Sequence, residues 1–173
     1  MEKAIKAYFA KFVTHARSPL KINIWQAVVA FVGGFLTILL LESIAEGLQW
    51  SLVIAPFGAS CVLAFVLPEA PVSQPRNIIG GHMVTTLCGL TVYHLWGNSI
   101  WSLSVAVGLG IALMLLTKTT HPPAGANPIV VITAASTWSF LVTPVLIGSI
   151  VIVCVAVLYN NLIKNRKYPT FWI

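Results

Sequence analysis

The most constraining feature of this sequence is a long interior stretch that is almost free of charge. Between Lys21 and Lys164 the charged residues are Glu42, Glu46, Glu69, Arg76 and Lys118. Apolar runs lie between them, and a hydrocarbon core of about 30 Å is crossed by roughly 20 helical residues. Only 8% of the residues are charged, whereas soluble domains carry about 25%. We therefore expect an all-α polytopic membrane protein.

Six apolar segments follow one another along this stretch. Four are long enough to cross a bilayer as single helices: residues 24–41, 77–96, 99–117 and 144–162. Two are awkward, because residues 50–67 contain Pro56 within an apolar run and residues 127–142 are short and follow a proline pair. Proline removes a backbone donor and stops the preceding helix. The expected fold is four full spans plus two broken or re-entrant segments, or six spans as a 3+3 inverted repeat.

The two awkward segments resemble each other, which indicates an internal duplication. Both contain Pro-x-Gly-Ala followed by a residue that often caps helices. A shift of 67 residues places Pro56, Gly58, Ala59 and Ser60 on Pro123, Gly125, Ala126 and Asn127. The two halves of a bundle at residues 23–163 would then be residues 23–96 and 99–163. They would be inverted if both awkward segments cross fully and parallel if both are re-entrant. The alternative is two unrelated helix breaks.

The basic residues flank the apolar stretch. Five lie before it (Lys3, Lys6, Lys11, Arg17, Lys21) and three after it (Lys164, Arg166, Lys167). Basic flanks stay on the cytoplasmic side of a membrane, so both termini are expected to be cytoplasmic in a multi-pass protein of the bacterial inner membrane. Residues 164–173 form the expected cytoplasmic tail. A nucleic-acid or lipid-headgroup patch is the alternative for the net charge of +6, and we do not expect nucleic acid.

Residues 1–22 are expected to form an amphipathic segment on the inner membrane surface. Its apolar side chains fall at helical spacing between lysines. They are Ile5, Tyr8, Phe9, Phe12 and Val13.

The two breaks are the candidate binding site. Ser60 and Asn127 are expected to cap helix starts, and free amides at a helix N-terminus bind anions. Gly58 and Gly125 would let a ligand approach the backbone closely. The remaining candidates at the breaks are Ala59, Lys118, Thr120, His121, Pro122 and Pro123. The alternative is that these residues only shape a tight turn.

Arg76, Asn77 and His82 are candidate pathway residues. Ionisable residues inside a membrane are costly and are functional candidates by default. The alternatives are that Arg76 marks the cytoplasmic end of a span and that His82 is a neutral side chain bonded to a neighbouring helix. The single cysteines and the widely separated histidines have no metal-ligand spacing. We expect no metal, no cofactor and no enzymatic activity.

The sequence resembles the HPP family of integral membrane proteins. The likeness runs through nearly all six segments. It is carried by His-Pro-Pro-Ala-Gly-Ala at residues 121–126, by Ala-Pro-Phe-Gly-Ala-Ser at 55–60 and by Gln-Pro-Arg-Asn at 74–77. The family is usually described as four-spanning. Its plant plastid and cyanobacterial members are associated with nitrite transport, so the resemblance implies a small-anion transporter.

We therefore expect a channel or secondary transporter for a small inorganic anion, with nitrite favoured. Proton coupling through His82 or His121 is open. The alternative is a structural or assembly subunit without its own substrate. A polar cavity at the breaks favours transport, whereas a dry core favours the structural role. A homo-oligomer is plausible, because a chain of this size need not enclose a pathway alone.

Overall fold

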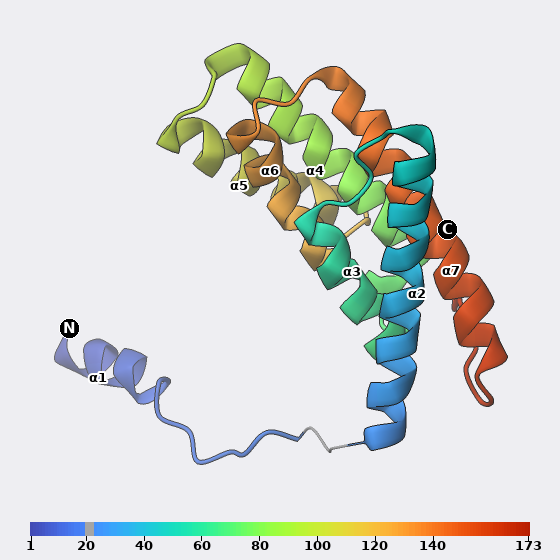
Figure 1. The fold of residues 1–173 in the computed structure, drawn as a ribbon. Helices are drawn as coiled ribbons and strands as arrows, with labels where there is room; N and C mark the ends of the chain where they lie inside the picture. The colour runs from blue at the N-terminus through green and yellow to red at the C-terminus, as the bar shows by residue number, and fades with distance from the viewer. Residues whose placement is uncertain (20–22) are drawn as a thin grey trace.

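The computed structural model describes the chain except residues 20–22, and of residue 2 it describes only the backbone. Lys21 and the end of the N-terminal segment therefore lie outside the described residues. The described part is helical, without a β-strand (Figure 1). Its α-helices are α1 (Glu2–Ala10), α2 (Ile24–Leu48), α3 (Ala55–Val66), α4 (Pro75–Trp96), α5 (Ile100–Leu116), α6 (Asn127–Thr133) and α7 (Ile147–Leu162). The 3₁₀ turns are η1 (Pro71–Ser73), η2 (Pro122–Ala126) and η3 (Trp138–Leu141), and a π-helical turn, η4 (Val142–Leu146), leads into α7.

Among the described residues, three helical stretches are long and apolar enough to cross a membrane: Ile24–Leu48, Pro75–Trp96 and Trp138–Leu162. The first extends past the expected end at residue 41. Glu42 and Glu46 are still helical, and the helix ends where Gln49 adopts a left-handed conformation. Helix α5 has 17 residues, or about 25 Å at 1.5 Å per residue. Helix α3 has 12 residues, or about 18 Å, so α3 alone is too short to span the hydrocarbon core.

The prolines begin helices here rather than interrupting them. Pro56 lies in the first turn of α3, whose N-cap is Ile54. The prediction that Ser60 caps a helix start is therefore wrong: Ser60 lies inside α3, and its hydroxyl lies 3.1 Å from the Pro56 carbonyl oxygen. Asn127 is also not an N-cap, since Ala126 holds that position and the Asn127 side chain bonds to His82 and Thr86. Pro128 does occupy the first turn of α6, as its type favours.

Residues 127–142 do not form one helix. Helix α6 ends at Thr133, Ala135 has a positive φ, and the chain resumes as η3. The proline pair before α6 lies in the 3₁₀ turn η2, between His121 and Asn127.

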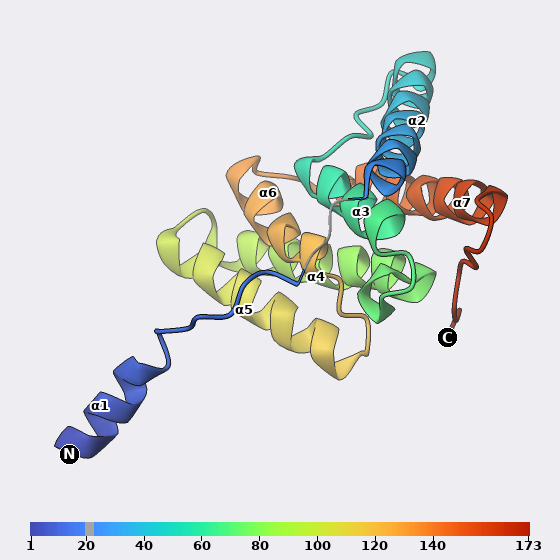
Figure 2. The same ribbon diagram turned by 90° about the horizontal axis from the view of Figure 1, so that it is seen from below.

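Each short helix runs alongside a long one in the same direction (Figures 1 and 2). Along α7, Leu52 lies against Gly148, and the Asn160 side-chain amide donates to the Ala64 carbonyl. Along α4, the Asn127 side chain meets His82 near the start, and Trp138 stacks on His94 near the end. A short helix together with its non-helical flanks thus passes through the bundle, and the direction of the chain alternates from segment to segment.

The helix packing has a repeated pattern. Helix α2 packs against α3 and α7, whereas α5 packs against α6 and α4. Helix α3 in turn packs on α7, and α6 packs on α4. Gly81 and Gly148, which the 67-residue shift superimposes, each lie against a broken segment: Gly81 contacts the backbone of Thr119 and the Cβ of His121, and Gly148 contacts the ring of Phe57. This pattern is what two related halves would produce.

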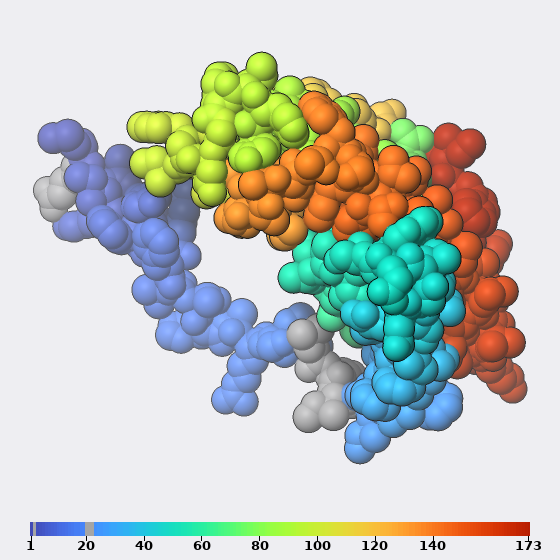
Figure 3. All heavy atoms as spheres, turned by 45° about the horizontal axis from the view of Figure 1, so that its top comes forward, coloured from blue at the N-terminus to red at the C-terminus, as the bar shows by residue number. Residues whose placement is uncertain are grey.

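The main apolar core lies among α2, α3, α4 and α7, and a smaller cluster joins α4, α5 and α6. In the space-filling view, the orange segment with α6 and the start of α7 lies between the end of α4 and the loop after α2 (Figure 3). Helix α1 projects the predicted apolar side chains outward, and Ile5, Tyr8 and Phe9 are all exposed. Phe12 and Val13 follow its C-terminus and are also exposed.

Candidate functional site

Four polar side chains from three segments meet inside the bundle. Ser60 comes from α3, His82 from α4, and His121 and Asn127 flank η2; all four are fully buried. Ser60 Oγ lies 2.8 Å from His82 Nε2 and 2.8 Å from His121 Nε2. The two imidazole centroids are 5.1 Å apart. We call these four residues the polar cluster.

One backbone carbonyl fixes the direction of hydrogen bonding through the polar cluster. His121 Nδ1 lies 2.7 Å from the Val72 carbonyl oxygen, which can only accept, so His121 carries a proton on Nδ1. In a neutral imidazole the other nitrogen is then an acceptor, and Ser60 donates to His121 Nε2. The Ser60 oxygen in turn accepts from His82 Nε2. Both neutral histidines are thereby assigned opposite tautomers.

Asn127 completes this chain. Its Nδ2 lies 2.9 Å from His82 Nδ1 and 2.8 Å from Thr86 Oγ1, so one amide group donates to both. The ring of Phe57 packs edge-on against His82, with 5.2 Å between centroids. The cluster is therefore enclosed by apolar packing on one side and satisfied by internal hydrogen bonds.

A basic pocket adjoins the polar cluster. It has a volume of about 520 Å³. Its lining combines η1, the start of α4, the connection after α5 and the C-terminal tail: Pro71, Val72, Arg76, Asn77, Lys118, Thr120, Phe171 and Ile173. Val72 faces both features, because it lines the pocket while its carbonyl accepts from His121. The pocket and the polar cluster are therefore neighbours, with Val72 between them.

The first turn of α4 holds the end of α5 at this pocket. The Arg76 guanidinium donates to the carbonyls of Thr117 and Lys118 at 3.1 and 3.3 Å. A cation at a helix C-terminus is stabilising because the exposed carbonyls carry partial negative charge. Arg76 therefore lies in the first turn of α4 and lines the pocket, a position that is compatible with both roles that the sequence left as alternatives.

Asn77 brings an unpaired acceptor to the same pocket. Its Nδ2 donates to the Thr120 carbonyl at 2.9 Å, which fixes the orientation of the amide. Asn77 is 6% exposed, and its Oδ1 is buried without a hydrogen-bond partner among the described residues. Buried polar atoms are normally paired, so this oxygen is the unsatisfied polar atom of the residues that line the pocket.

The structure gathers most of the predicted site residues and separates others. Gly58 and Ala59 are exposed, and Gly58 lines an apolar groove between α2 and α3 rather than the polar cluster. Pro122 is exposed and Pro123 is buried within η2, while Gly125 is half-buried with open space beside it. Because Ser60 and Asn127 are not caps, the expected cradle of two capped helix starts is wrong.

Sequence reasoning missed five residues: Thr86 beside the polar cluster, and Pro71, Val72, Phe171 and Ile173 in the pocket lining. Thr86 lies four residues after His82, on the same face of α4, and that spacing could have identified it. Val72 contributes only its backbone, and Phe171 reaches the pocket from the tail, so no residue-type signal marked either of them.

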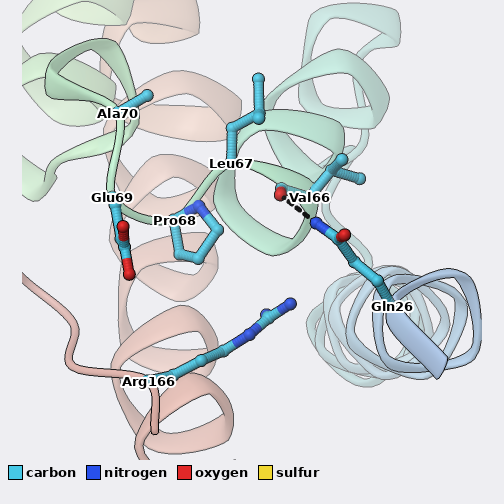
Figure 4. Close-up of a pocket in the computed structure, with 7 residues that line it drawn as sticks. All are labelled: Gln26, Val66, Leu67, Pro68, Glu69, Ala70 and Arg166. Carbon is cyan, nitrogen blue, oxygen red and sulfur yellow. Dashed lines mark hydrogen bonds between the residues drawn. The ribbon is translucent and has the colours of Figure 1, made fainter. Parts of the chain in front are cut away.

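A second pocket, of about 270 Å³, lies where α2 begins and α3 ends (Figure 4). Gln26 donates to the Val66 carbonyl at 2.9 Å, and Arg166 donates to the Phe65 carbonyl at 3.0 Å. Arg166 also donates to Asn160 Oδ1 at 2.8 Å. These bonds satisfy the carbonyls at the end of α3, so packing accounts for the polar residues here.

Comparison with known proteins places these features in a family. The family model described as HPP, transmembrane region, matches residues 19–169. A transmembrane protein of Dictyostelium discoideum is 30% identical over 177 residues, covering 95% of this chain and 57% of that protein. A second transmembrane protein of the same organism is 31% identical over 156 residues, covering 86% and 55%. The chain thus spans about half the length of these relatives. No solved structure matches it.

Proposed function

Because the chain belongs to the HPP transmembrane family, we propose that it is a channel or secondary transporter for a small inorganic anion, with nitrite as the first candidate. The observation that carries this proposal is the basic pocket lined by Arg76 and Lys118, which adjoins the buried polar cluster at Val72. Catalysis is not part of the proposal.

The pocket has the chemistry to attract a small anion and hold it with part of its water. Two cationic side chains raise the local concentration of anions. An arginine has five N–H donors, and two of those of Arg76 are bonded to the end of α5, so three remain for a ligand. Thr120 also lines the pocket, and its hydroxyl can exchange a long contact of 3.5 Å to the Met114 carbonyl oxygen for one to the anion.

Passage beyond the pocket requires the polar cluster to open. Its side chains are fully buried and bonded to one another, so this arrangement corresponds to a closed state. Separation of Ser60 from His121 would let an anion leave the pocket and exchange its water for hydroxyl, amide and imidazole groups. Selectivity would follow from the placement of those donors.

The proposal includes six crossings arranged as two inverted halves. The alternating direction of the six segments and the two short helices at corresponding positions support it. Broken helices meeting near the midplane of inverted repeats are a common way to build a transport site. Both termini then lie on one side, which the basic flanks make cytoplasmic. The proposal does not include the expected bacterial inner membrane, since the relatives come from Dictyostelium discoideum rather than a bacterium.

This topology is tested by labelling single cysteines with a membrane-impermeant reagent in intact cells. Six crossings predict that Asn98→Cys is labelled from outside and that Glu69→Cys is labelled only after permeabilisation. Four crossings with re-entrant segments predict the reverse. The wild-type chain, with its own three cysteines, provides the background.

Nitrite flux into liposomes containing purified protein tests the function. We expect Arg76→Gln and Lys118→Gln each to lower the initial rate about tenfold at low nitrite concentration, because about 1.4 kcal/mol of anion attraction corresponds to that factor. Arg166→Gln and Lys164→Gln are matched controls outside the pocket, and their rates should stay near wild type. Equal losses in both pairs would show that the pocket is not the anion site.

A structural or assembly subunit is the second candidate. The hydrogen bonds among the four side chains of the polar cluster favour it, because a packed core would look the same. Wild-type flux no greater than that of protein-free liposomes, for nitrite and for other small anions, would support this alternative.

A further inference from the structure

The Ser60 hydroxyl has three partners, and their chemistry restricts where protons can lie. Its oxygen lies 2.8 Å from Nε2 of both His82 and His121, and 3.1 Å from the Pro56 carbonyl oxygen. A hydroxyl donates one proton and accepts at two lone pairs. The carbonyl can only accept. All three contacts are therefore satisfied together only if both histidines present N–H groups to Ser60.

Two neutral histidines do not meet this condition. The Val72 carbonyl holds the His121 proton on Nδ1, so His121 Nε2 is an acceptor in the neutral ring. Ser60 must then donate to His121 and gives up the bond to Pro56. One additional proton on His121 Nε2 resolves the conflict, because Ser60 then accepts from both histidines and donates to Pro56.

We propose that the polar cluster is a binding site for one proton and that the anion moves together with this proton. This inference rests on the proposed anion transport. When the proton binds, an N–H bond forms at His121 Nε2, while the Ser60 O–H bond is kept and turns toward Pro56. Release reverses both changes.

The groups around His121 explain why proton and anion bind together. Arg76 and Lys118 line the adjoining pocket, and His82 contacts the same hydroxyl. Cys61 follows Ser60 on α3, and Tyr168 of the tail bonds to the Ser73 carbonyl beside Val72. The described side-chain carboxylates line other pockets: Glu42, Glu46 and Glu69. Ile173, whose main chain ends in a carboxylate, lines the basic pocket itself.

With the pocket empty, two cations oppose a third positive charge on His121. A bound anion offsets that repulsion, so it raises the proton affinity of the polar cluster. Coupling between two binding sites is reciprocal, and the bound proton raises the anion affinity by the same factor.

Asn127 provides a route by which a proton can reach His121 through His82. His82 Nδ1 lies 2.9 Å from the Asn127 Nδ2 and 3.2 Å from its Oδ1, so a small amide rotation exchanges donor for acceptor. A proton bound at His82 Nδ1 can then move on. The His82 Nε2–H bond breaks as Ser60 Oγ takes that proton, and the original Ser60 proton bonds to His121 Nε2. The hydroxyl keeps one proton, and the charge passes between the histidines.

The test is nitrite uptake into liposomes with and without an inward proton gradient, at a clamped membrane potential. Protein-free liposomes measure passive permeation of nitrous acid. We expect the gradient to raise wild-type uptake several-fold. His121→Gln keeps a polar side chain that carries no proton, and its uptake should not respond to the gradient. His94→Gln is the matched control, since His94 bonds only to its own helix at the far end of α4 and stacks on Trp138.

The outcomes separate the two proposals. Wild-type uptake that exceeds the protein-free value but ignores the gradient overturns the proton site and leaves anion transport intact. Uptake at the protein-free value overturns both. If His121→Gln does not fold, nitrogen NMR of histidine-labelled wild-type protein decides. Nitrite at constant pH should shift His121 from its Nδ1–H form toward the doubly protonated ring, and an unchanged ring contradicts the proposal.

Discussion

The two broken segments of this protein share a backbone plan but differ in what their side chains do. Both place a proline in the first turn of a short helix that runs beside a long one. At the start of α3 the ring of Phe57 packs on Gly148 and carries apolar contacts. Beside Gly81, which corresponds to Gly148, lie the Cβ of His121 and the backbone of Thr119 instead, and His121 and Asn127 around η2 are both fully buried and hydrogen-bonded.

This difference teaches that one half of the bundle supplies the packing and the other supplies most of the chemistry. Helix α3 contributes a single polar group, Ser60, to the polar cluster. The two arginines differ in a similar way. Arg166 satisfies the end of α3 and Asn160, whereas Arg76 satisfies the end of α5 and also lines the pocket that adjoins the cluster.

The largest loss of stability should come from a substitution at the start of α3, where Phe57 carries the apolar packing. Phe57→Ala removes a fully buried ring, and such changes cost about 3–5 kcal/mol because a cavity remains. Denaturant unfolding in detergent micelles measures this loss. Phe31→Ala is the matched control, because Phe31 is 70% exposed. A loss of less than 1 kcal/mol at Phe57 would contradict the packing role assigned to this half.

A substitution beside η2, at Asn127, should cost less stability but should abolish nitrite flux. Asn127→Ala leaves His82 Nδ1 and Thr86 Oγ1 without their donor, and an unsatisfied buried group costs about 1–3 kcal/mol. Nitrite flux should fall to the protein-free level while the protein remains folded. Asn98→Ala, at an exposed residue before α5, should change neither quantity. Normal flux in folded Asn127→Ala protein would remove the polar cluster from the transport route.

Much of the fold could be predicted because it depends on local composition. Apolar length predicted three of the four expected full spans, whereas α5, in the segment expected at residues 99–117, has only 17 residues. The prolines predicted where the chain breaks, but α3 begins at Ala55 and not after Ser60. The site was predicted only in part. Ser60, His121 and Asn127 were correctly named as candidates at the two breaks. The roles predicted for Ser60 and Asn127, as helix caps, were wrong. Their side chains instead bond to His82 and Thr86, because α4 offers buried partners that local sequence does not reveal.

The sequence by itself determined the membrane class, the family and the two proline-initiated breaks, since each follows from residue types within short windows. Only the tertiary structure decided that Ser60, His82 and His121 form one hydrogen-bonded chain, and that Arg76 and Lys118 share a pocket beside it. Those residues are far apart in the chain. Hydrogen bonds at 2.8 Å depend on how α3, α4 and η2 pack together, which is a property of the whole bundle.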